Sequence, residues 1–512
     1  MACFLKKIFG KKTEKFNYFE QTTPILVEES AFDIGKTNNG KEKYSEYISK
    51  LIATTPSARQ LNYLEMEKYA FIHFGINTFS NREWGDGAES ESIFNPTNLD
   101  TDQWCRIIKQ AGLAGVIITA KHHDGFCLWQ TQTTEHSIKN SPYKNGAGDI
   151  VKELAESAKK AGLKFGVYLS PWDMNSKFYG HNTYNNFYLK QLQELTTNYG
   201  DLFSVWFDGA CGAKNIDKDF AYDFESFYAL IRKNQPNAVL AVSAPDVRWI
   251  GNEGGHARKC EWSVVCDLQT NQDKIAELSQ QNPEMAKKLA EINSFNEDLG
   301  SREYLKSFDN FVFYPAEMDV SIRKSWFYHK KETPKTATQL EFIYYKSVGA
   351  NASLLLNLPV DKRGLIDEKD EKVLLEFGNK IKQDKANKIE YTASVGGKNT
   401  TQKEELKALF AEDSSSYKFK NDEYILDLTL KNLERVKIVD LRENLQYSQR
   451  IEQFSVYAKV DAGWLLLANS TNIGNRRTII FDDKNVVATN CVRIVIEQSR
   501  DNPVLRSVCL YK

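Results

Sequence analysis

The 512-residue chain has no long apolar run. No segment approaches the roughly 18 consecutive apolar residues that a helix needs to cross a bilayer. The apolar stretches near residue 1 are also too short for the hydrophobic core of a signal peptide. The sequence alone therefore predicts a cytoplasmic protein without a membrane span. Export to the periplasm or the cell exterior is the alternative.

Charge and metal-binding motifs are equally sparse. A net charge of −1 gives no electrostatic reason to expect nucleic acid or an anionic membrane as a partner. The eight cysteines form no CxxC pair, so we expect reduced, buried thiols rather than a disulfide framework or a zinc site. No HxH, HxxxH or GxSxG motif is present, which disfavours a metal centre and a serine nucleophile.

What the sequence does contain is a regular alternation of β-rich runs and amphipathic helices. The helical patterns cover 100–113, 149–163, 185–200 and 222–236, and the second begins with Asp149 as its expected N-cap and ends at a glycine. Eight runs are candidates for strands, the least regular being "CEWSVV": 68–75, 114–123, 163–170, 201–209, 237–245, 260–265, 310–317 and 352–359. This alternation predicts a (β/α)8 barrel. An open doubly wound sheet is the alternative, but no glycine-rich phosphate loop follows the first run.

The pattern changes near residue 388, where seven short segments alternate apolar and polar residues between turns. This alternating pattern is typical of an antiparallel β-sandwich. We therefore predict an N-terminal extension (1–55) with a possible helix over 41–54, a catalytic barrel (56–385) and a β-sandwich (386–512). The charged segment 268–306 is expected to be a helical excursion on the outer surface or near the active-site rim. Whether the sandwich binds carbohydrate or braces the barrel is left open.

Polar and aromatic side chains gather where the predicted strands end. In a barrel of parallel strands these ends meet on one face, where active sites lie. The residues concerned are His73, Glu83, Trp84, Asp86, Lys121, His122, His123, Asp124, Tyr168, Trp172, Asp173, Trp206, Asp208, Asp246, Arg248, Trp249, Glu253 and Glu317. Carboxylates among tryptophans are typical of glycoside hydrolases, in which two carboxyl groups flank the scissile bond. The histidines could instead bind a metal, although His122 and His123, as neighbours in a strand, would point to opposite sides.

Several of these segments carry a family resemblance. "FIHFG", "EWGDG", "KHHDGFCLW", "YLSPWD", "WFDGA" and "NASLLLNLPVDKRGLI" resemble the α-L-fucosidases of glycoside hydrolase family 29 over roughly residues 55–380. The resemblance implies that Asp208 of "WFDG" is the nucleophile. The motif "RWIGNEGG" resembles the branch that prefers 1,3- and 1,4-linked fucose, which implies Glu253 as the acid/base. Glu83, Glu261 and Glu317 are the rival carboxyls.

By the same resemblance a further set of residues is expected to bind fucose. They are His73, Glu83, Trp84, His122, His123 and Trp206, with Tyr168, Trp172 and Trp326 from less specific matches. The implied activity is a retaining exo-α-L-fucosidase acting on fucosylated oligosaccharides or glycoconjugates, without cofactor or metal. In a retaining enzyme the two carboxyls lie about 5–5.5 Å apart, with Asp208 ionised and Glu253 initially protonated.

Three alternatives stay open. The first is a broad-specificity fucosidase with another acid/base, and the second is a fucose-binding protein that has lost catalysis. The third is a metal-dependent hydrolase using His73, His122 and His123. The sequence does not indicate an oligomeric state.

Overall fold

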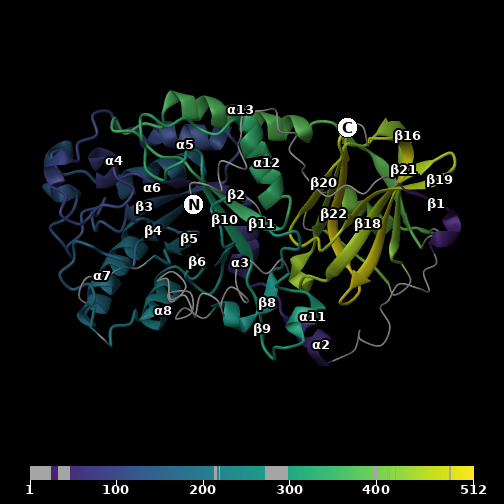
Figure 1. The fold of residues 1–512 in the computed structure, drawn as a ribbon, viewed down its shortest axis with the longest axis horizontal. Helices are drawn as coiled ribbons and strands as arrows, with labels where there is room; N and C mark the ends of the chain where they lie inside the picture. The colour runs from purple at the N-terminus through teal and green to yellow at the C-terminus, as the bar shows by residue number, and fades with distance from the viewer. Residues whose placement is uncertain are drawn as a thin grey trace.

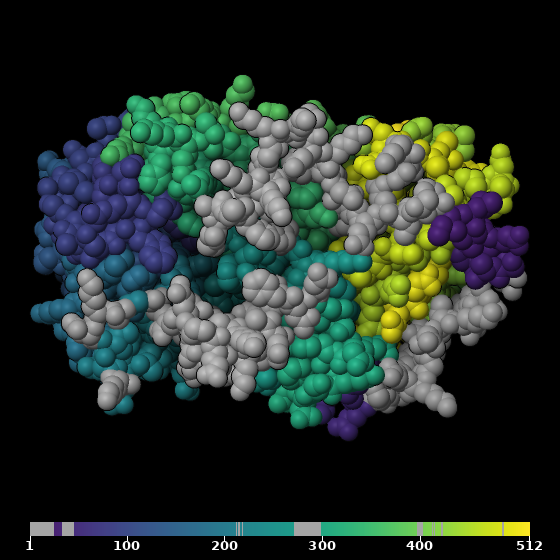
Figure 2. All heavy atoms as spheres, in the orientation of Figure 1, coloured from purple at the N-terminus to yellow at the C-terminus, as the bar shows by residue number. Residues whose placement is uncertain are grey.

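The computed structural model describes residues 25–32, 46–210, 212, 216–217, 219–255, 257–270, 298–396, 401–411, 413, 415–420, 423–483 and 486–512. Figure 1 shows a unit of strands and helices beside a second unit built of strands. In the space-filling view the same two units lie side by side, and a recess opens between the purple-blue and teal parts of the first (Figure 2).

The first unit is an eight-stranded parallel sheet that curls into a nearly closed barrel. Its strands are β2 (Lys68–Ile72), β3 (Gly115–Lys121), β4 (Lys164–Leu169), β5 (Ser204–Phe207), β6 (Val239–Val242), β7 (Arg248–Trp249), β10 (Ala316–Ser321) and β11 (Ala352–Asn357). They are ordered β6-β5-β4-β3-β2-β11-β10-β7. A parallel bridge between Ala241 and Val247 links the two ends of this order. The predicted barrel is therefore confirmed.

Helices follow most of the barrel strands and cover the outside of the sheet (Figure 1). They are α5 (Thr101–Gln110), α6 (Ile150–Ala161), α7 (Thr183–Asn198), α8 (Phe224–Asn234), α12 (Ala337–Ser347) and α13 (Glu368–Asp384). As predicted, Asp149 caps α6 by accepting a hydrogen bond from the backbone N–H of Lys152 at 2.9 Å. The helix ends at Gly162, whose φ of 69° lies in the left-handed region that glycine tolerates.

Two of the predicted strands are wrong in detail. The run 260–265 is not a barrel strand: β8 (Val264–Cys266) pairs antiparallel with β9 (Phe311–Phe313) in a separate two-stranded sheet. The run 310–317 contains both β9 and the start of β10. The sixth barrel strand is instead β7, which has only two residues and pairs with β10. So short a strand has no apolar pattern from which it could be recognised.

The second unit is the predicted antiparallel β-sandwich. One sheet runs β1 (Ile25–Val27), β19 (Gly463–Ser470), β18 (Ile451–Val460), β21 (Ala488–Ser499), β16 (Ile425–Arg435), β13 (Tyr391–Val395) and β14 (Thr401–Gln402). The other runs β12 (Lys388–Ile389), β22 (Val504–Tyr511), β17 (Ile438–Glu443) and β20 (Arg477–Ile480), and β15 (Tyr417–Lys418) also pairs with β22. Apolar side chains of both sheets share one core.

The N-terminal segment joins this sandwich, which the sequence did not predict. β1 pairs with β19 through three residues, so residues from the start of the chain extend a C-terminal sheet. The smaller helices are α2 (Glu46–Ala53), α3 (Ala58–Leu64), α4 (Ile76–Ser80), α11 (Arg302–Leu305) and α14 (Ala408–Ala411). α2 lies within the helix predicted over 41–54. The prediction for 268–306 falls mostly on 271–297, outside the described residues, and the boundaries of the three domains stay predictions.

Among the described residues, no helix has both the length and the apolar character needed to cross a membrane. All six cysteines in the described ranges are buried: Cys105, Cys127, Cys260, Cys266, Cys491 and Cys509.

Candidate active site

Four of the predicted site residues converge at the carboxyl ends of the barrel strands β2, β3 and β5. His73 follows β2, His122 and His123 follow β3, and Asp208 follows β5. Their rings are in contact: the centroid of His122 lies 5.7 Å from that of His73 and 4.0 Å from that of His123. The face that active sites occupy in such barrels therefore holds the expected cluster.

Asp208 is held by two hydrogen-bond donors. The Tyr168 hydroxyl donates to Oδ2 at 3.0 Å, and the backbone N–H of Ala210 donates to Oδ1 at 2.7 Å. Nε2 of His123 lies 3.8 Å from Oδ2. The Asp208 side chain is still 25% exposed, so this oriented carboxylate can be reached by a substrate.

The three histidines are buried and neutral. Burial lowers the pKa of His73 to about 3, although a hydrogen bond with Asn357 opposes the shift. Burial also lowers the pKa of His122 and of His123, in the latter case against the negative charge of Asp208. Nδ1 of His73 donates to Oδ1 of Asn357 at 2.8 Å, and Nδ1 of His123 lies 2.7 Å from the hydroxyl of Ser170. Neutral rings fixed in this way suit the recognition of sugar hydroxyls.

Aromatic side chains form the walls around these histidines. Tyr168 stacks on Trp206 with ring centroids 5.3 Å apart, and the ring centroid of Trp326 lies 5.1 Å from that of His73. Trp84 is 57% exposed and meets Trp172 edge to face. These rings offer apolar surface for a sugar, and the five aromatic residues that the resemblance assigned to fucose binding all lie in this group.

Glu253 lies on the loop after β7 and faces the same cluster. It is an exposed residue. Nevertheless the loss of hydration around its carboxyl and then the negative charge of Asp208 raise its pKa. A hydrogen bond with the Trp326 side chain lowers the pKa in part, and the charge of Glu83 raises it further. Asp208 and Glu253 are therefore close enough to interact electrostatically.

The rival carboxyls are engaged elsewhere. Glu83 accepts hydrogen bonds from the backbone N–H groups of Trp326 at 2.7 Å and Phe327 at 3.2 Å, and so holds that loop. Glu261 is fully buried between Arg248 and Arg258. Burial acts to raise the pKa of Glu261, but the two arginines outweigh it and the pKa is lowered.

Glu317 is not at a strand end, as the sequence suggested, but is the second residue of β10. Its carboxylate is fully buried and accepts hydrogen bonds from the hydroxyls of Tyr63 and Tyr69 and from the indole N–H of Trp206. Burial raises its pKa although these three donors lower it. Glu317 therefore anchors the floor of the site.

Asp319, also on β10, was not among the predicted site residues. It is 5% exposed and accepts a hydrogen bond from Nε1 of Trp249 at 2.7 Å. Burial and then the charge of Glu253 raise its pKa well above the usual range. The alternation in "EMDVS" was the available signal, because Met318 and Val320 join the outer core while the acidic residues point into the barrel.

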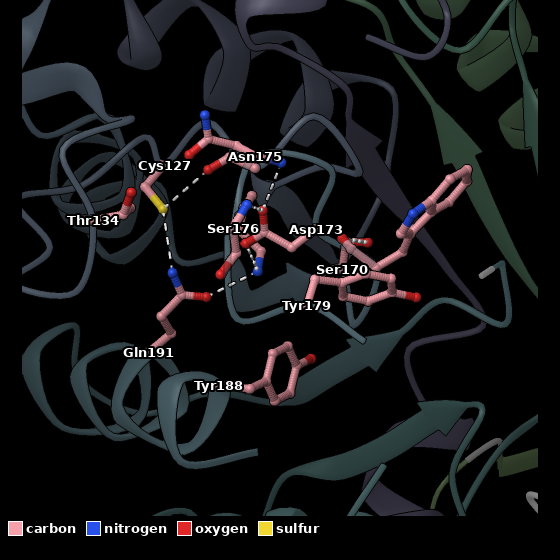
Figure 3. A network of polar contacts seen from close by, with 12 residues as sticks. Cys127, Thr134, Ser170, Asp173, Asn175, Ser176, Tyr179, Tyr188 and Gln191 are labelled. Atoms are coloured by element: carbon pink, nitrogen blue, oxygen red, sulfur yellow. Dashed lines mark hydrogen bonds and ion pairs between the residues drawn. The ribbon is translucent and has the colours of Figure 1, made fainter. Parts of the chain in front are cut away.

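A buried ion pair between Lys121 and Asp173 lies next to the cluster, since Lys121 directly precedes His122. Nζ of Lys121 donates to Oδ2 of Asp173 and to Oε1 of Gln191, each at 2.9 Å. Figure 3 shows Asp173 with Asn175, Ser176 and Gln191 around it. Oδ1 of Asp173 accepts from the backbone N–H groups of Asn175 and Ser176 at 3.1 and 2.8 Å. This network fixes the turn that follows β4 and carries Trp172.

No group of three or more His, Cys, Asp or Glu side chains placed to hold a metal ion occurs in the described part of the chain. The side chains that meet at this site are carboxylates, neutral histidines and aromatic rings. Two interacting carboxyls among histidines and aromatic rings at the mouth of a barrel are the arrangement that glycoside hydrolases use.

Comparison with known proteins gives the family. Residues 38–385 match the family model described as Alpha-L-fucosidase. The chain is 39% identical to Alpha-L-fucosidase 1 of Arabidopsis thaliana over 480 residues, which cover 90% of this chain and 88% of that protein. The chain belongs to the α-L-fucosidase family, glycoside hydrolase family 29, and hydrolyses α-L-fucosides, as the motifs implied.

Solved structures of similar proteins support this family assignment. The crystal structure of a Bacteroides ovatus protein superposes with a TM-score of 0.80 at 39% identity, covering 97% of this chain and 78% of that one. A Ruminococcus gnavus GH29 fucosidase in complex with fucose gives a TM-score of 0.76 at 27% identity, covering 95% of this chain and 99% of that one.

Proposed function

We propose that this α-L-fucosidase uses Asp208 as its nucleophile and Glu253 as its acid/base, and that it releases α-1,3- or α-1,4-linked fucose from the ends of oligosaccharides. The observation that carries the proposal is the proximity of the two carboxyls, since burial and then the charge of Asp208 raise the pKa of Glu253. A general acid must begin protonated beside an ionised nucleophile, and this arrangement favours that state.

In the first step an oxygen of Asp208 attacks the anomeric carbon of fucose. The glycosidic C–O bond breaks, its electron pair goes to the leaving oxygen, and that oxygen takes the proton of Glu253. The Glu253 carboxylate then removes a proton from water, whose oxygen attacks the same carbon. The bond to Asp208 breaks, and fucose leaves with its original anomeric configuration.

The surroundings support this assignment. Tyr168 and the backbone of Ala210 orient the Asp208 carboxylate through hydrogen bonds. His73, His122 and His123 are neutral and can bind fucose hydroxyls, while Trp206 and Trp326 offer apolar surface. The linkage preference rests on the resemblance of "RWIGNEGG", the segment that carries Glu253, to the 1,3/1,4 branch.

Azide rescue distinguishes the two roles by stereochemistry. In Glu253→Ala, azide should replace water in the second step and give α-L-fucosyl azide. In Asp208→Ala, azide should attack the substrate directly and give the β anomer. Glu83→Gln serves as the matched control and should give neither azide product. A β product from the Glu253 variant would contradict the assignment.

Linkage is tested with three substrates: an aryl α-L-fucoside, an α-1,3/1,4-fucosylated Lewis-type trisaccharide and an α-1,2-fucosylated trisaccharide. We expect the wild type to release fucose from the Lewis-type trisaccharide with the highest kcat/KM. Preference for the α-1,2 substrate would overturn the linkage proposal and leave the catalytic roles standing.

A further inference from the structure

Trp249 and Asp319 form a pair beside the catalytic carboxyls that the mechanism above does not use. Trp249 is the second residue of β7 and is 42% exposed. Its indole N–H donates to Oδ1 of Asp319 at 2.7 Å, and Asp319 itself is buried in β10. The backbones of the two strands are also paired, Trp249 lying opposite Glu317.

This pairing fixes the indole while leaving part of it open to solvent. A tryptophan side chain at a protein surface normally retains rotational freedom, which it would lose on binding a ligand. Here a buried carboxyl holds the N–H end of the ring, and that hydrogen bond is costly to break because it would leave a buried acceptor unpaired. The exposed surface of Trp249 is therefore preorganised for contact with a ring-shaped ligand.

The position of the pair indicates what that ligand is. Trp249 precedes Glu253 by four residues on the same connection, and the charge of Glu253 acts on the carboxyl of Asp319. Of the proposed fucose walls, Tyr168 and Trp206 lie on β4 and β5, while Trp326 contacts both His73 and Glu253 from the segment after β10. Because Glu253 delivers its proton to the leaving oxygen, Trp249, which begins the connection that carries Glu253, is placed toward the leaving-group side of the scissile bond.

We propose that Trp249, positioned by Asp319, is a stacking platform for the sugar to which fucose is attached. The inference rests on the proposed roles of Asp208 and Glu253. It makes Trp249 a specificity-determining residue, which favours oligosaccharides over small leaving groups, and it makes Asp319 a positioning residue that acts through the indole.

The test compares two substrates in each variant. α-L-Fucosyl fluoride has no ring beyond the scissile bond, and the second substrate is whichever fucosylated trisaccharide the wild type hydrolyses best. The readout is the ratio of the two kcat/KM values. In Trp249→Ala, kcat/KM for the trisaccharide should fall by about tenfold relative to kcat/KM for the fluoride, as expected for the loss of an aromatic contact. Tyr447→Ala removes an aromatic side chain of similar exposure, 44%, from the 3-10 helix between β17 and β18 and should leave the ratio unchanged.

Asp319 is tested in the same assay. Asp319→Asn keeps an oxygen that accepts from the indole and should retain the wild-type ratio, while Asp319→Ala should shift it in the same direction as Trp249→Ala. The double variant Trp249→Ala/Asp319→Ala should shift it no further than Trp249→Ala alone, because the two residues act as one unit.

The outcomes are separable. An unchanged ratio in Trp249→Ala, or additive shifts in the double variant, would overturn the inference. A wild type that prefers an α-1,2-linked trisaccharide would overturn the linkage proposal alone, since the Trp249 ratio is then measured with that substrate. A wild type that cleaves the fluoride and no trisaccharide would overturn both the platform and the linkage.

Discussion

At the scale of single residues, the site obtains different chemical behaviour from similar groups by changing their surroundings. Asp208 is held by a hydroxyl and a backbone N–H, whereas Glu253 has lost hydration and faces the charge of Asp208. Glu317 and Asp319 are buried deeper, and their pKa values are raised mainly by burial. The carboxyls of this one site therefore differ in their environments, which is how a protein divides acid, nucleophile and structural roles.

The pH dependence of the first chemical step should reveal Glu253. Its pKa is raised above 4.5, so the protonated acid persists to higher pH than in an ordinary glutamate and is lost as the pH rises through the raised value. We expect kcat/KM for the trisaccharide to have a basic limb above pH 4.5, because kcat/KM reports groups of the free enzyme. The limb should be absent with α-L-fucosyl fluoride, whose leaving group needs no proton.

Glu253→Gln supplies the control for this profile. Its residual trisaccharide activity should lack the basic limb, since the amide does not titrate. If kcat/KM fell at the same pH with both substrates, the titrating group would be one other than Glu253.

Tyr168 should contribute through its hydroxyl alone. In Tyr168→Phe the ring can still stack on Trp206, but Asp208 loses a donor at 3.0 Å. Hydrogen bonds to charged groups contribute about 1.5–3 kcal/mol, so kcat/KM should fall by about 10- to 150-fold. Tyr188→Phe is the matched control: that hydroxyl donates to the backbone oxygen of Leu169, and its loss should lower the melting temperature rather than kcat/KM. Equal losses of activity in both variants would contradict the role of Tyr168.

At the scale of elements, the sequence predicted what depends on repeated patterns. Six barrel strands, the start of a seventh, four covering helices and the sandwich strands were visible because apolar residues recur with period 3.6 or 2 or run continuously through buried strands. The cap at Asp149 followed from local hydrogen bonding, which depends on neighbouring residues only. The convergence of His73, His122, His123 and Asp208 then followed from the common direction of parallel strands.

The elements that were missed depend on distant partners. β7 is a strand because β10 lies beside it, and β1 because β19 offers an edge some 440 residues later in the chain. Asp319 was overlooked because its environment is created by Trp249 and Glu253 from other elements. Such features become visible only when the chain is folded.

The turn after β4 should depend on the buried pair Lys121 and Asp173. In Lys121→Met, the Asp173 carboxylate would stay buried without its counter-charge, which typically costs 3–5 kcal/mol, so about this loss in the free energy of unfolding is expected. Urea denaturation followed by circular dichroism measures it. Adding Asp173→Asn should recover part of the loss, because the amide oxygen can still accept from Asn175 and Ser176. No recovery in the double variant would show that Lys121 acts through Gln191 instead.

At the scale of the whole molecule, the sandwich is joined to the barrel by charged groups on the side away from the catalytic face. Glu67 precedes the first residue of β2, and its carboxylate accepts hydrogen bonds from Arg442 and Arg476 of the sandwich. The sandwich also reaches the segment after Glu253, where Oε1 of Gln449 accepts from the backbone N–H of Ser263 at 2.8 Å. These contacts favour a bracing role for the sandwich, whether or not it also binds carbohydrate.

Glu67→Ala tests this bracing. The change leaves the buried guanidinium of Arg476 with one carboxylate partner, Asp440, instead of two, and we expect the free energy of unfolding to fall by about 3 kcal/mol. Because Glu67 lies at the amino end of β2, opposite the catalytic face, kcat/KM below the melting temperature should stay near that of the wild type. Glu67→Gln keeps an oxygen acceptor and should lose less stability. If Glu67→Ala instead lowered kcat/KM and left the melting temperature unchanged, the contact would act on the active site rather than on the attachment of the two units.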